Sequence, residues 1–384
     1  MSIRYLLLGL LESLKNCGVD IVSVSAAGDE VAVIESKGIR HISIPITRKA
    51  LSPISDAHTL LSLYKIMKSE NFTIVHTHFH KSGIYGRIAA KLAGVPIIIH
   101  TNHGLIFHER SHWIWRRLFI FLEKIAGYCS DLIFSVNQED IQTLICEGIT
   151  SPEKVKLLGR GGIGINLNRF NPVTISDLVL DRTRLEIGIP SNVKVVCFVG
   201  RLVKEKGVLD LLMAAKLVIN KFPDVIFLFV GPADVEKADA LNSDLACKYG
   251  VYDKCIFTGK RDDMPIIYML SDICILPSYR EGFGMVLAEA AAMGKPVIAT
   301  NIRGCREAVE DGRNGVLVPP GNFKLLADAI LDLLTDEEKS HCLGEEGKKI
   351  ALERFDERKV FDKVKHEYAR LLNEKGFSVP VELR

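Results

Sequence analysis

The chain lacks the sequence features that mark several large classes of protein. Its nine cysteines are odd in number and form no Cys-x-x-Cys pair, so they predict neither a disulfide framework nor a zinc ribbon and fit a reducing cytoplasm best. No apolar run approaches the roughly 20 residues of a membrane-spanning helix. No short-period repeat or low-complexity segment occurs. A net charge of only +2 over 384 residues gives no reason to expect a nucleic-acid partner.

What the sequence does contain is an alternation of apolar strand patterns and helix patterns, which is typical of parallel α/β sheets. A polar stretch over residues 166–192 looks irregular and separates two such series. We therefore expect domains at residues 1–170 and 171–355, followed by a helical segment at 356–384. The expected strands are residues 21–25, 41–44, 74–78, 97–101, 132–136, 155–158, 195–199, 225–230, 255–257, 273–276 and 297–299.

The most informative segment runs from Glu281 to Glu289. An apolar strand pattern precedes Glu281, a loop with Gly282 and Gly284 follows, and a helix pattern contains Glu289. Both carboxylates are therefore expected at the carboxyl end of one strand, where they can accept hydrogen bonds from sugar and ribose hydroxyls. The glycines let the backbone approach a ligand, and the helix start suits a diphosphate. Two solvated carboxylates without function are the alternative, which this spacing disfavours.

Two cations occupy the corresponding place after an earlier strand. Arg201 follows the apolar run at 195–199, and Lys206 precedes a helix pattern that starts near Gly207. Fixed cations beside a helix N-terminus, at the carboxyl end of a parallel strand, are typical of a phosphate site. The alternative is a pair of surface charges that are neutralised by Glu205.

With these segments the chain resembles the retaining GT-B glycosyltransferases of family four, whose signature is two glutamates separated by seven residues. Within that family it is most similar to bacterial enzymes that build capsular, exopolysaccharide or O-antigen repeat units on a lipid carrier. The resemblance covers almost the whole chain and implies two Rossmann-like domains that face a central cleft, with a C-terminal helix that crosses back to the N-terminal domain. It extends to residues 75–78, 81–83, 101–104, 134–137 and 200–207.

The resemblance implies roles for the site residues. Arg201 and Lys206 would bind the donor diphosphate without a metal, Glu281 would hold the hydroxyls of the donor sugar, and Glu289 would hold those of the ribose. His103 would approach the donor sugar, and Lys81 and Gly83 would belong to an acceptor-side loop. The remaining donor-binding residues implied are Arg261, Gly282, Phe283, Gly284, Met285 and Val286.

The implied activity is a metal-independent, retaining transfer of a hexose or N-acetylhexosamine. The donor would be a nucleotide sugar of the UDP type, and the acceptor a polyprenyl-diphosphate-linked saccharide of surface polysaccharide biosynthesis. No cofactor is expected. A non-hydrolysing sugar-nucleotide epimerase, which shares the two-domain architecture, is an alternative that the glutamate and cation pattern disfavours.

A third possibility, a truncated nucleotide-sugar-binding remnant, follows from one departure. Family members begin with a buried strand and a glycine loop before their first helix, whereas this sequence begins with an amphipathic helix pattern at residues 3–16. We therefore expect the N-terminal domain to lack a central strand and to be the weaker half, with unpaired backbone groups on neighbouring strands.

Two further features leave alternatives open. Histidines crowd the N-terminal half at positions 76, 78, 80, 100, 103, 108 and 112, but a metal site is disfavoured because no acidic or cysteine ligand accompanies them. In residues 112–122, two tryptophans and two arginines flank an apolar helix pattern. This pattern is compatible both with core packing and with peripheral contact on the inner face of the cytoplasmic membrane.

Overall fold

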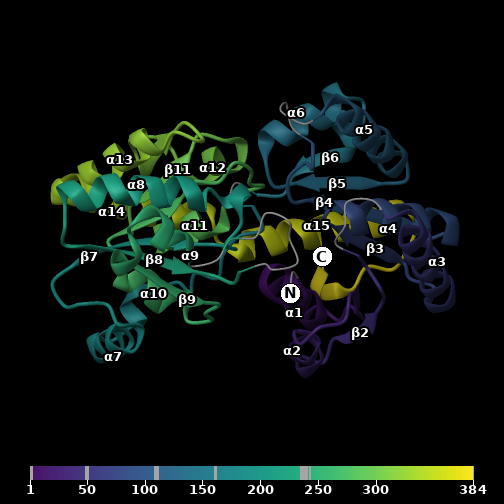
Figure 1. The fold of residues 1–384 in the computed structure, drawn as a ribbon. Coiled ribbons are helices and arrows are strands. Elements are labelled where there is room, and N and C mark those ends of the chain that lie inside the picture. The colour runs from purple at the N-terminus through teal and green to yellow at the C-terminus, as the bar shows by residue number, and fades with distance from the viewer. Residues whose placement is uncertain are drawn as a thin grey trace. The chain divides into compact units, whose positions relative to one another are not determined.

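The computed structural model describes residues 3–47, 52–107, 112–159, 162–233, 241 and 244–383. The chain divides into two compact units, and each is described by itself. Unit 1 comprises Met1–Ile163 and Glu357–Arg384, and unit 2 comprises Gly164–Asp356. The first division thus lies a few residues before position 170, and the last long helix packs with the N-terminal part of the chain. Both units have the parallel α/β architecture that the sequence predicts (Figure 1).

In unit 1, every paired strand is parallel, and the described strands form a two-stranded sheet, β1-β2, and a four-stranded sheet, β3-β4-β5-β6. Strand β4 is buried along its whole length, because helices cover both faces of a parallel sheet. The expectation that a central strand is missing stays a prediction. The elements are η1 (Ile3–Leu7), α1 (Leu8–Asn16), β1 (Val22–Ser25), α2 (Val31–Ser36), β2 (Arg40–Ser43), α3 (Pro53–Glu70), β3 (Ile74–His78), α4 (His80–Ala93), β4 (Ile97–Asn102), α5 (Trp113–Tyr128), β5 (Leu132–Ser135), α6 (Gln138–Cys146), η2 (Pro152–Lys154), β6 (Val155–Leu157), α15 (Glu357–Glu374) and η6 (Val381–Leu383).

The first helix packs through leucines at helical spacing. Leu7, Leu10 and Leu14 are buried, so that η1 and α1 present one apolar stripe to the interior of unit 1. Helix α15 lies against α1, and the side chain of Phe361 comes within 3.0 Å of the position that a Cβ atom on Gly9 would occupy. A glycine at position 9 therefore allows these two helices to approach each other closely.

Unit 2 contains one parallel sheet in the order β12-β11-β10-β7-β8-β9. The chain enters at β7, builds outward through β8 and β9, and then returns to the other side of β7 with β10, so the sheet is doubly wound. The elements are η3 (Pro172–Thr174), α7 (Asp177–Ile187), β7 (Lys194–Val199), η4 (Lys204–Lys206), α8 (Val208–Lys221), β8 (Val225–Val230), α9 (Asp244–Tyr249), η5 (Tyr252–Lys254), β9 (Cys255–Gly259), α10 (Met264–Leu270), β10 (Ile273–Leu276), α11 (Met285–Ala292), β11 (Val297–Thr300), α12 (Arg303–Ala308), β12 (Gly315–Val318), α13 (Phe323–Thr335) and α14 (Glu337–Arg354).

Two local expectations were wrong. The stretch at residues 166–192 is not irregular, because it contains helix α7, which packs on α10 while Leu178 and Leu185 on its surface stay exposed. Strand β12, a four-residue edge strand that begins with a glycine, was also not expected from the sequence. No helix within the described ranges is long and apolar enough to cross a bilayer.

Candidate active site

The loops that follow β7 and β10 lie against each other at the point where the strand order of unit 2 reverses. The backbone N–H of Tyr279 donates to the carbonyl of Glu205 at 2.9 Å. Gly207 has a φ of 71°, and a Cβ atom there would lie 1.9 Å from the carbonyl oxygen of Pro277. Only glycine fits this approach. In doubly wound sheets, ligands bind outside the carboxyl ends of the strands at this reversal.

Lys206 and Glu281 meet at this edge. Lys206 comes from the turn after β7 and Glu281 from the loop after β10, and the Nζ of Lys206 donates to Oε1 of Glu281. Both side chains are mostly enclosed, with exposed fractions of 20% and 13%. A second ion pair, between Arg280 and Glu205 at 2.8 Å, joins the same two loops. The structure therefore brings together two of the residues that the sequence predicts for the donor site.

Glu289 lies one turn into α11 and accepts a hydrogen bond at 2.7 Å from the hydroxyl of Tyr268 on α10. Although part of its side chain remains accessible, protein atoms crowd the carboxylate and raise its pKa to about 7. The Tyr268 hydrogen bond and the positive charge of Arg169 act in the opposite direction. The sequence analysis missed Tyr268, whose side chain is fully buried.

The remaining donor-side residues differ in what they can offer. The side chain of Phe283 belongs to the core, since it packs edge-on against Phe355 at 5.6 Å between ring centroids. Only the backbone of residues 282–284 is thus left for a ligand. Gly284 is the N-cap of α11 with a φ of 63°, and the partly exposed Met285 and Val286 form the first turn of that helix.

Arg201 and Arg261 lie in different surroundings. Arg201 is half-buried directly after β7. Arg261 makes two hydrogen bonds to Asp263, at 2.8 and 2.6 Å, and a third to Glu186 at 2.9 Å. Its guanidinium is therefore already neutralised by carboxylates, which favours a structural role for Arg261 over contact with a donor.

In unit 1, His103 follows the carboxyl end of β4. Its Nε2 lies 3.1 Å from Nδ1 of His78, the last residue of β3. The ring of Phe79 stacks on the imidazole of His103, with centroids 4.5 Å apart and an interplanar angle of 22°. Two neighbouring strand ends thus fix one imidazole through a hydrogen bond and a ring stack.

Phe79 has an unusual backbone. It is the only residue between β3 and α4, and its φ of 62° and ψ of 171° lie in a region that essentially only glycine adopts. A conformation of this kind costs about 1–3 kcal/mol for a residue with a Cβ atom. Its carbonyl accepts the first helical hydrogen bond of α4, from Gly83 N–H at 2.9 Å, which holds the turn in place.

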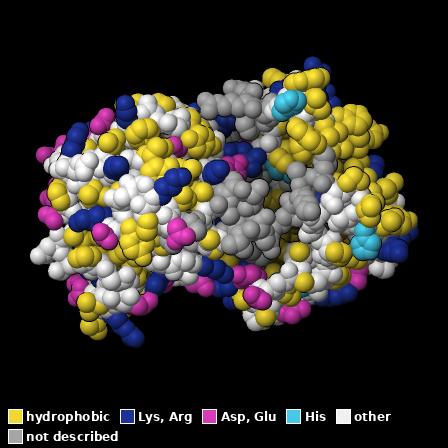
Figure 2. All heavy atoms as spheres, in the orientation of Figure 1, with side chains coloured by type: hydrophobic (Ala, Val, Ile, Leu, Met, Phe, Trp, Pro, Cys, Tyr) yellow, Lys and Arg dark blue, Asp and Glu magenta, His cyan; other side chains and the backbone are white. Residues whose placement is uncertain are grey.

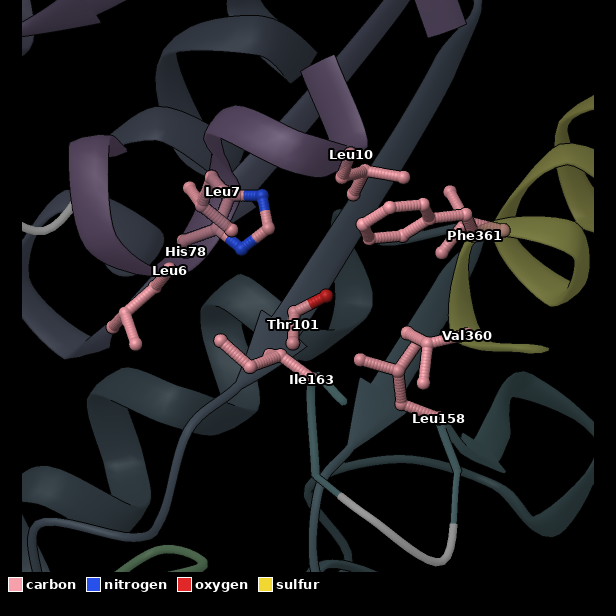
Figure 3. A pocket seen from close by; sticks show the side chains of 10 residues that line it. Leu6, Leu7, Leu10, His78, Thr101, Leu158, Ile163, Val360 and Phe361 are labelled. Atoms are coloured by element: carbon pink, nitrogen blue, oxygen red, sulfur yellow. The ribbon is translucent and has the colours of Figure 1, made fainter. Parts of the chain in front are cut away.

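His78 also contacts a further histidine, His76. The rings of His76 and His78 stack at 4.4 Å, and the two nitrogens of His76 lie 2.8 Å from the hydroxyls of Tyr368 and Thr101. Figure 3 shows His78 and Thr101 in a narrow pocket whose other walls are apolar side chains from the first helices, α15 and the segment after β6: Leu6, Leu7, Leu10, Leu158, Ile163, Val360, Phe361 and Val364.

Burial keeps these imidazoles neutral. It lowers the pKa of His76 to about 3 and the pKa values of His78, His100 and His103 well below their usual range, and the neighbouring histidines add to the effect. The histidines of unit 1 were also considered as ligands of a metal ion. Within the described part of the chain, no group of three or more His, Cys, Asp and Glu side chains is placed to bind one, and His108 lies outside that part.

The two acceptor-side residues take part in helix packing. The Nζ of Lys81 on α4 lies 2.7 Å from Oδ1 of Asp56 on α3, and both side chains are largely buried. A Cβ atom on Gly83 would lie 2.5 Å from the ring of His100, so glycine is needed for α4 to approach β4. Their contribution to acceptor binding stays a prediction.

We predict that the stability of unit 1 falls as the pH falls below 6.5. An unfolded histidine titrates near pH 6.5, whereas His76 stays neutral in the folded unit down to a pKa of about 3. The unfolded state therefore binds more protons in this window, and the stability present above pH 6.5 is lost by about 1.4 kcal/mol per pH unit for each such histidine.

Thermal unfolding between pH 7.5 and 5.0 measures this loss. His76→Gln should make the dependence on pH shallower, whereas His58→Gln, at an exposed position of α3, should leave it unchanged. If the unfolding temperature of the wild type and of His76→Gln fell equally with pH, burial of His76 would not be the cause of the loss of stability in acid.

Comparison with known proteins matches both halves of the chain to glycosyltransferases. Residues 5–161 match the model "Glycosyltransferase Family 4", and residues 181–350 match "Glycosyl transferases group 1". The UDP-Gal:alpha-D-GlcNAc-diphosphoundecaprenol alpha-1,3-galactosyltransferase of Escherichia coli is 31% identical over 332 residues, which are 86% of this chain and 84% of the relative. The capsular polysaccharide biosynthesis glycosyltransferase CapM of Staphylococcus aureus is 29% identical over 374 residues, which are 96% and 94% of the two chains.

Among solved structures, that of Anabaena Alr3699/HepE in complex with UDP and glucose superimposes with a TM-score of 0.81 and covers 96% of both chains. Its sequence identity is 22%. At that identity the likeness shows the fold, which is the GT-B arrangement of two Rossmann-like units. It confirms the fold that the sequence predicts.

Proposed function

The chain belongs to the glycosyltransferases of group 1 and family 4, and on that premise we propose that it catalyses metal-independent, retaining transfer of a hexose or N-acetylhexosamine. The observation that carries the proposal is the meeting of Lys206 with Glu281 at the strand reversal of unit 2, with Glu289 on the helix that follows. The proposed donor is a UDP-sugar.

The geometry of unit 2 supports separate roles for its cations and its carboxylates in binding the donor. As the bond between the sugar and the diphosphate breaks, negative charge grows on the leaving diphosphate, and a fixed cation such as Lys206 stabilises that charge. Arg201 and the first turn of α11 are assigned to the same diphosphate. Glu281 then accepts hydrogen bonds from the sugar hydroxyls and Glu289 from the ribose hydroxyls, which favour its ionised form.

In unit 1 we assign His103 to orienting a substrate hydroxyl. Burial lowers its pKa so far that the imidazole is a weak base, which disfavours proton abstraction by His103. We propose instead a front-face reaction. The acceptor oxygen forms its bond to the anomeric carbon on the side from which the phosphate oxygen leaves, and the acceptor proton passes to that phosphate oxygen.

The acceptor that we propose is a saccharide linked to a polyprenyl diphosphate. The E. coli relative is named for a GlcNAc-diphosphoundecaprenol acceptor, and the S. aureus relative for capsular polysaccharide biosynthesis. Both are glycosyltransferases by name, so the comparisons do not favour the epimerase alternative. The function proposed is therefore one step in building a lipid-linked surface polysaccharide on the cytoplasmic side of the membrane.

We predict that Lys206→Ala lowers kcat/KM by about 10²–10³-fold, because the cation that stabilises the leaving diphosphate is lost. Glu289→Ala should cause a loss of similar size through the ribose contact. Lys204→Ala is the matched control, since Lys204 is exposed on the same turn. The measurement is transfer from UDP-galactose to GlcNAc-diphosphoundecaprenol, with thermal unfolding to confirm an intact fold. Wild-type turnover in a folded Lys206→Ala protein would refute the assignment of Lys206.

We also predict that chelation leaves transfer unchanged, because Arg201 and Lys206 supply the positive charge that a metal supplies elsewhere. The measurement is turnover after dialysis against EDTA, compared with turnover in added manganese. Loss of activity in EDTA with recovery in manganese would contradict metal independence.

A lipid-linked acceptor requires access to a membrane surface, and we propose that helix α5 provides it. Apart from Trp115, its exposed positions follow one helical face at spacings of three and four, and they combine large apolar side chains with two cations. The buried Ile120, Glu123, Ala126 and Gly127 lie on the opposite side. Hydrophobic side chains gather where α5 lies in unit 1 (Figure 2). The exposed positions on this face are Trp113, Ile114, Arg117, Phe121, Lys124, Ile125 and Tyr128, and Trp115 is exposed beside it.

The chain offers a direct test, because its two tryptophans, Trp113 and Trp115, both lie on α5. We predict a blue shift of tryptophan fluorescence and co-sedimentation with vesicles that contain phosphatidylglycerol, and much less of either with phosphatidylcholine alone. Phe121→Ser with Ile125→Ser should weaken binding at least 10-fold. Leu178→Ser with Leu185→Ser, at exposed positions of α7, is the control. Equal binding by both double variants would refute the assignment to α5.

A further inference from the structure

Phe79 occupies a backbone position where glycine would be free of strain. Strand β3 ends at His78 and α4 begins at His80, so the whole change of direction falls on one residue. A glycine would adopt the resulting φ of 62° without steric conflict. The presence of a large aromatic residue in this position therefore indicates that its side chain provides something that glycine cannot.

The contact that Phe79 makes is with His103. The two rings are nearly parallel, with centroids 4.5 Å apart. The turn that aims Phe79 is held on both sides, because its carbonyl accepts from Gly83 N–H at 2.9 Å and the carbonyl of His78 accepts from the Ser82 hydroxyl at 2.5 Å. The ring of Phe79 is thus a fixed platform under one face of the imidazole.

His78 constrains the same imidazole in a second way. A hydrogen bond joins Nδ1 of His78 to Nε2 of His103 at 3.1 Å, so Nδ1 is the nitrogen through which His103 can reach a substrate hydroxyl. A hydrogen bond at one ring nitrogen still allows the ring to tilt. A stack against its face removes that freedom.

We propose that Phe79 is a positioning residue for sugar transfer: its strained turn holds the aromatic ring against His103 and fixes the plane in which His103 presents Nδ1 to substrate. This inference rests on the proposed function, in which His103 orients a substrate hydroxyl. It adds that the backbone strain at Phe79 is retained because the ring contact requires it.

Three variants separate the ring from the strain. Phe79→Leu removes the ring and keeps the strained backbone, Phe79→Gly removes both, and Phe79→Tyr keeps both. With UDP-galactose and GlcNAc-diphosphoundecaprenol, we expect kcat to fall at least 10-fold in the leucine and glycine variants, with the donor KM changed less than threefold. The tyrosine variant should retain activity, and Phe79→Gly should unfold at a higher temperature than Phe79→Leu.

A readout that is independent of turnover is the ring ¹⁵N and ¹H shifts of His103 in histidine-labelled protein, assigned with His103→Gln. We expect the wild type and Phe79→Tyr to share one set of shifts, and the leucine and glycine variants to lose the upfield ring-current shift. Unchanged His103 shifts in Phe79→Leu, or full kcat in that variant, would overturn the inference. If the wild type fails to transfer galactose, the proposed function is in question, and the shifts alone decide whether Phe79 positions His103.

Discussion

The close approach of Gly207 to Pro277 is the constraint on which the site in unit 2 depends. A Cβ atom at position 207 would lie 1.9 Å from the carbonyl oxygen of Pro277, so the turn after β7 can lie against the loop after β10 only if it contains glycine here. That approach is what allows Lys206 to reach Glu281 although the two are 75 residues apart in sequence. The ion pair is therefore a consequence of backbone packing at the strand reversal, and not of local sequence.

Unit 1 also encloses polar side chains in its cluster of histidines, but these side chains are uncharged. Its enclosed histidines are neutral imidazoles, and neutral groups can be enclosed by apolar residues at much lower cost than charged ones. The walls formed by α1 and α15 around His78 keep these rings uncharged at neutral pH. In return the rings are held in place by hydroxyl, imidazole and aromatic neighbours. The histidine cluster of unit 1 is therefore neutral, whereas the strand reversal of unit 2 contains charged side chains.

The sequence predicted best the strands whose two faces are both buried, because such strands are continuous apolar runs. Strands β3, β8 and β10 have the bounds expected from their apolar runs. It missed α7 because exposed leucines blur the apolar stripe, and β12 because a short edge strand that begins with Gly315 carries little pattern. Among the predicted site residues, the structure places Lys206 against Glu281, and the roles of Glu281, Glu289, Arg201 and Lys206 stay predictions. Tyr268 and Phe79 escaped because their roles come from partners more than 20 residues away, and because phenylalanine is not expected at a positive φ.

The partners found in unit 2 limit the cost of enclosing two carboxylates at the strand reversal. An enclosed carboxylate without a partner is strongly destabilising. Here the Lys206 ammonium neutralises Glu281, and the Tyr268 hydroxyl donates to Glu289. Under the proposed function, a donor would offer a diphosphate to Lys206 and hydroxyls to the two glutamates, so binding would exchange one set of partners for another. Glu281 thus has a cationic partner within unit 2, whereas Glu289 has a neutral one, and burial raises the pKa of Glu289 to about 7.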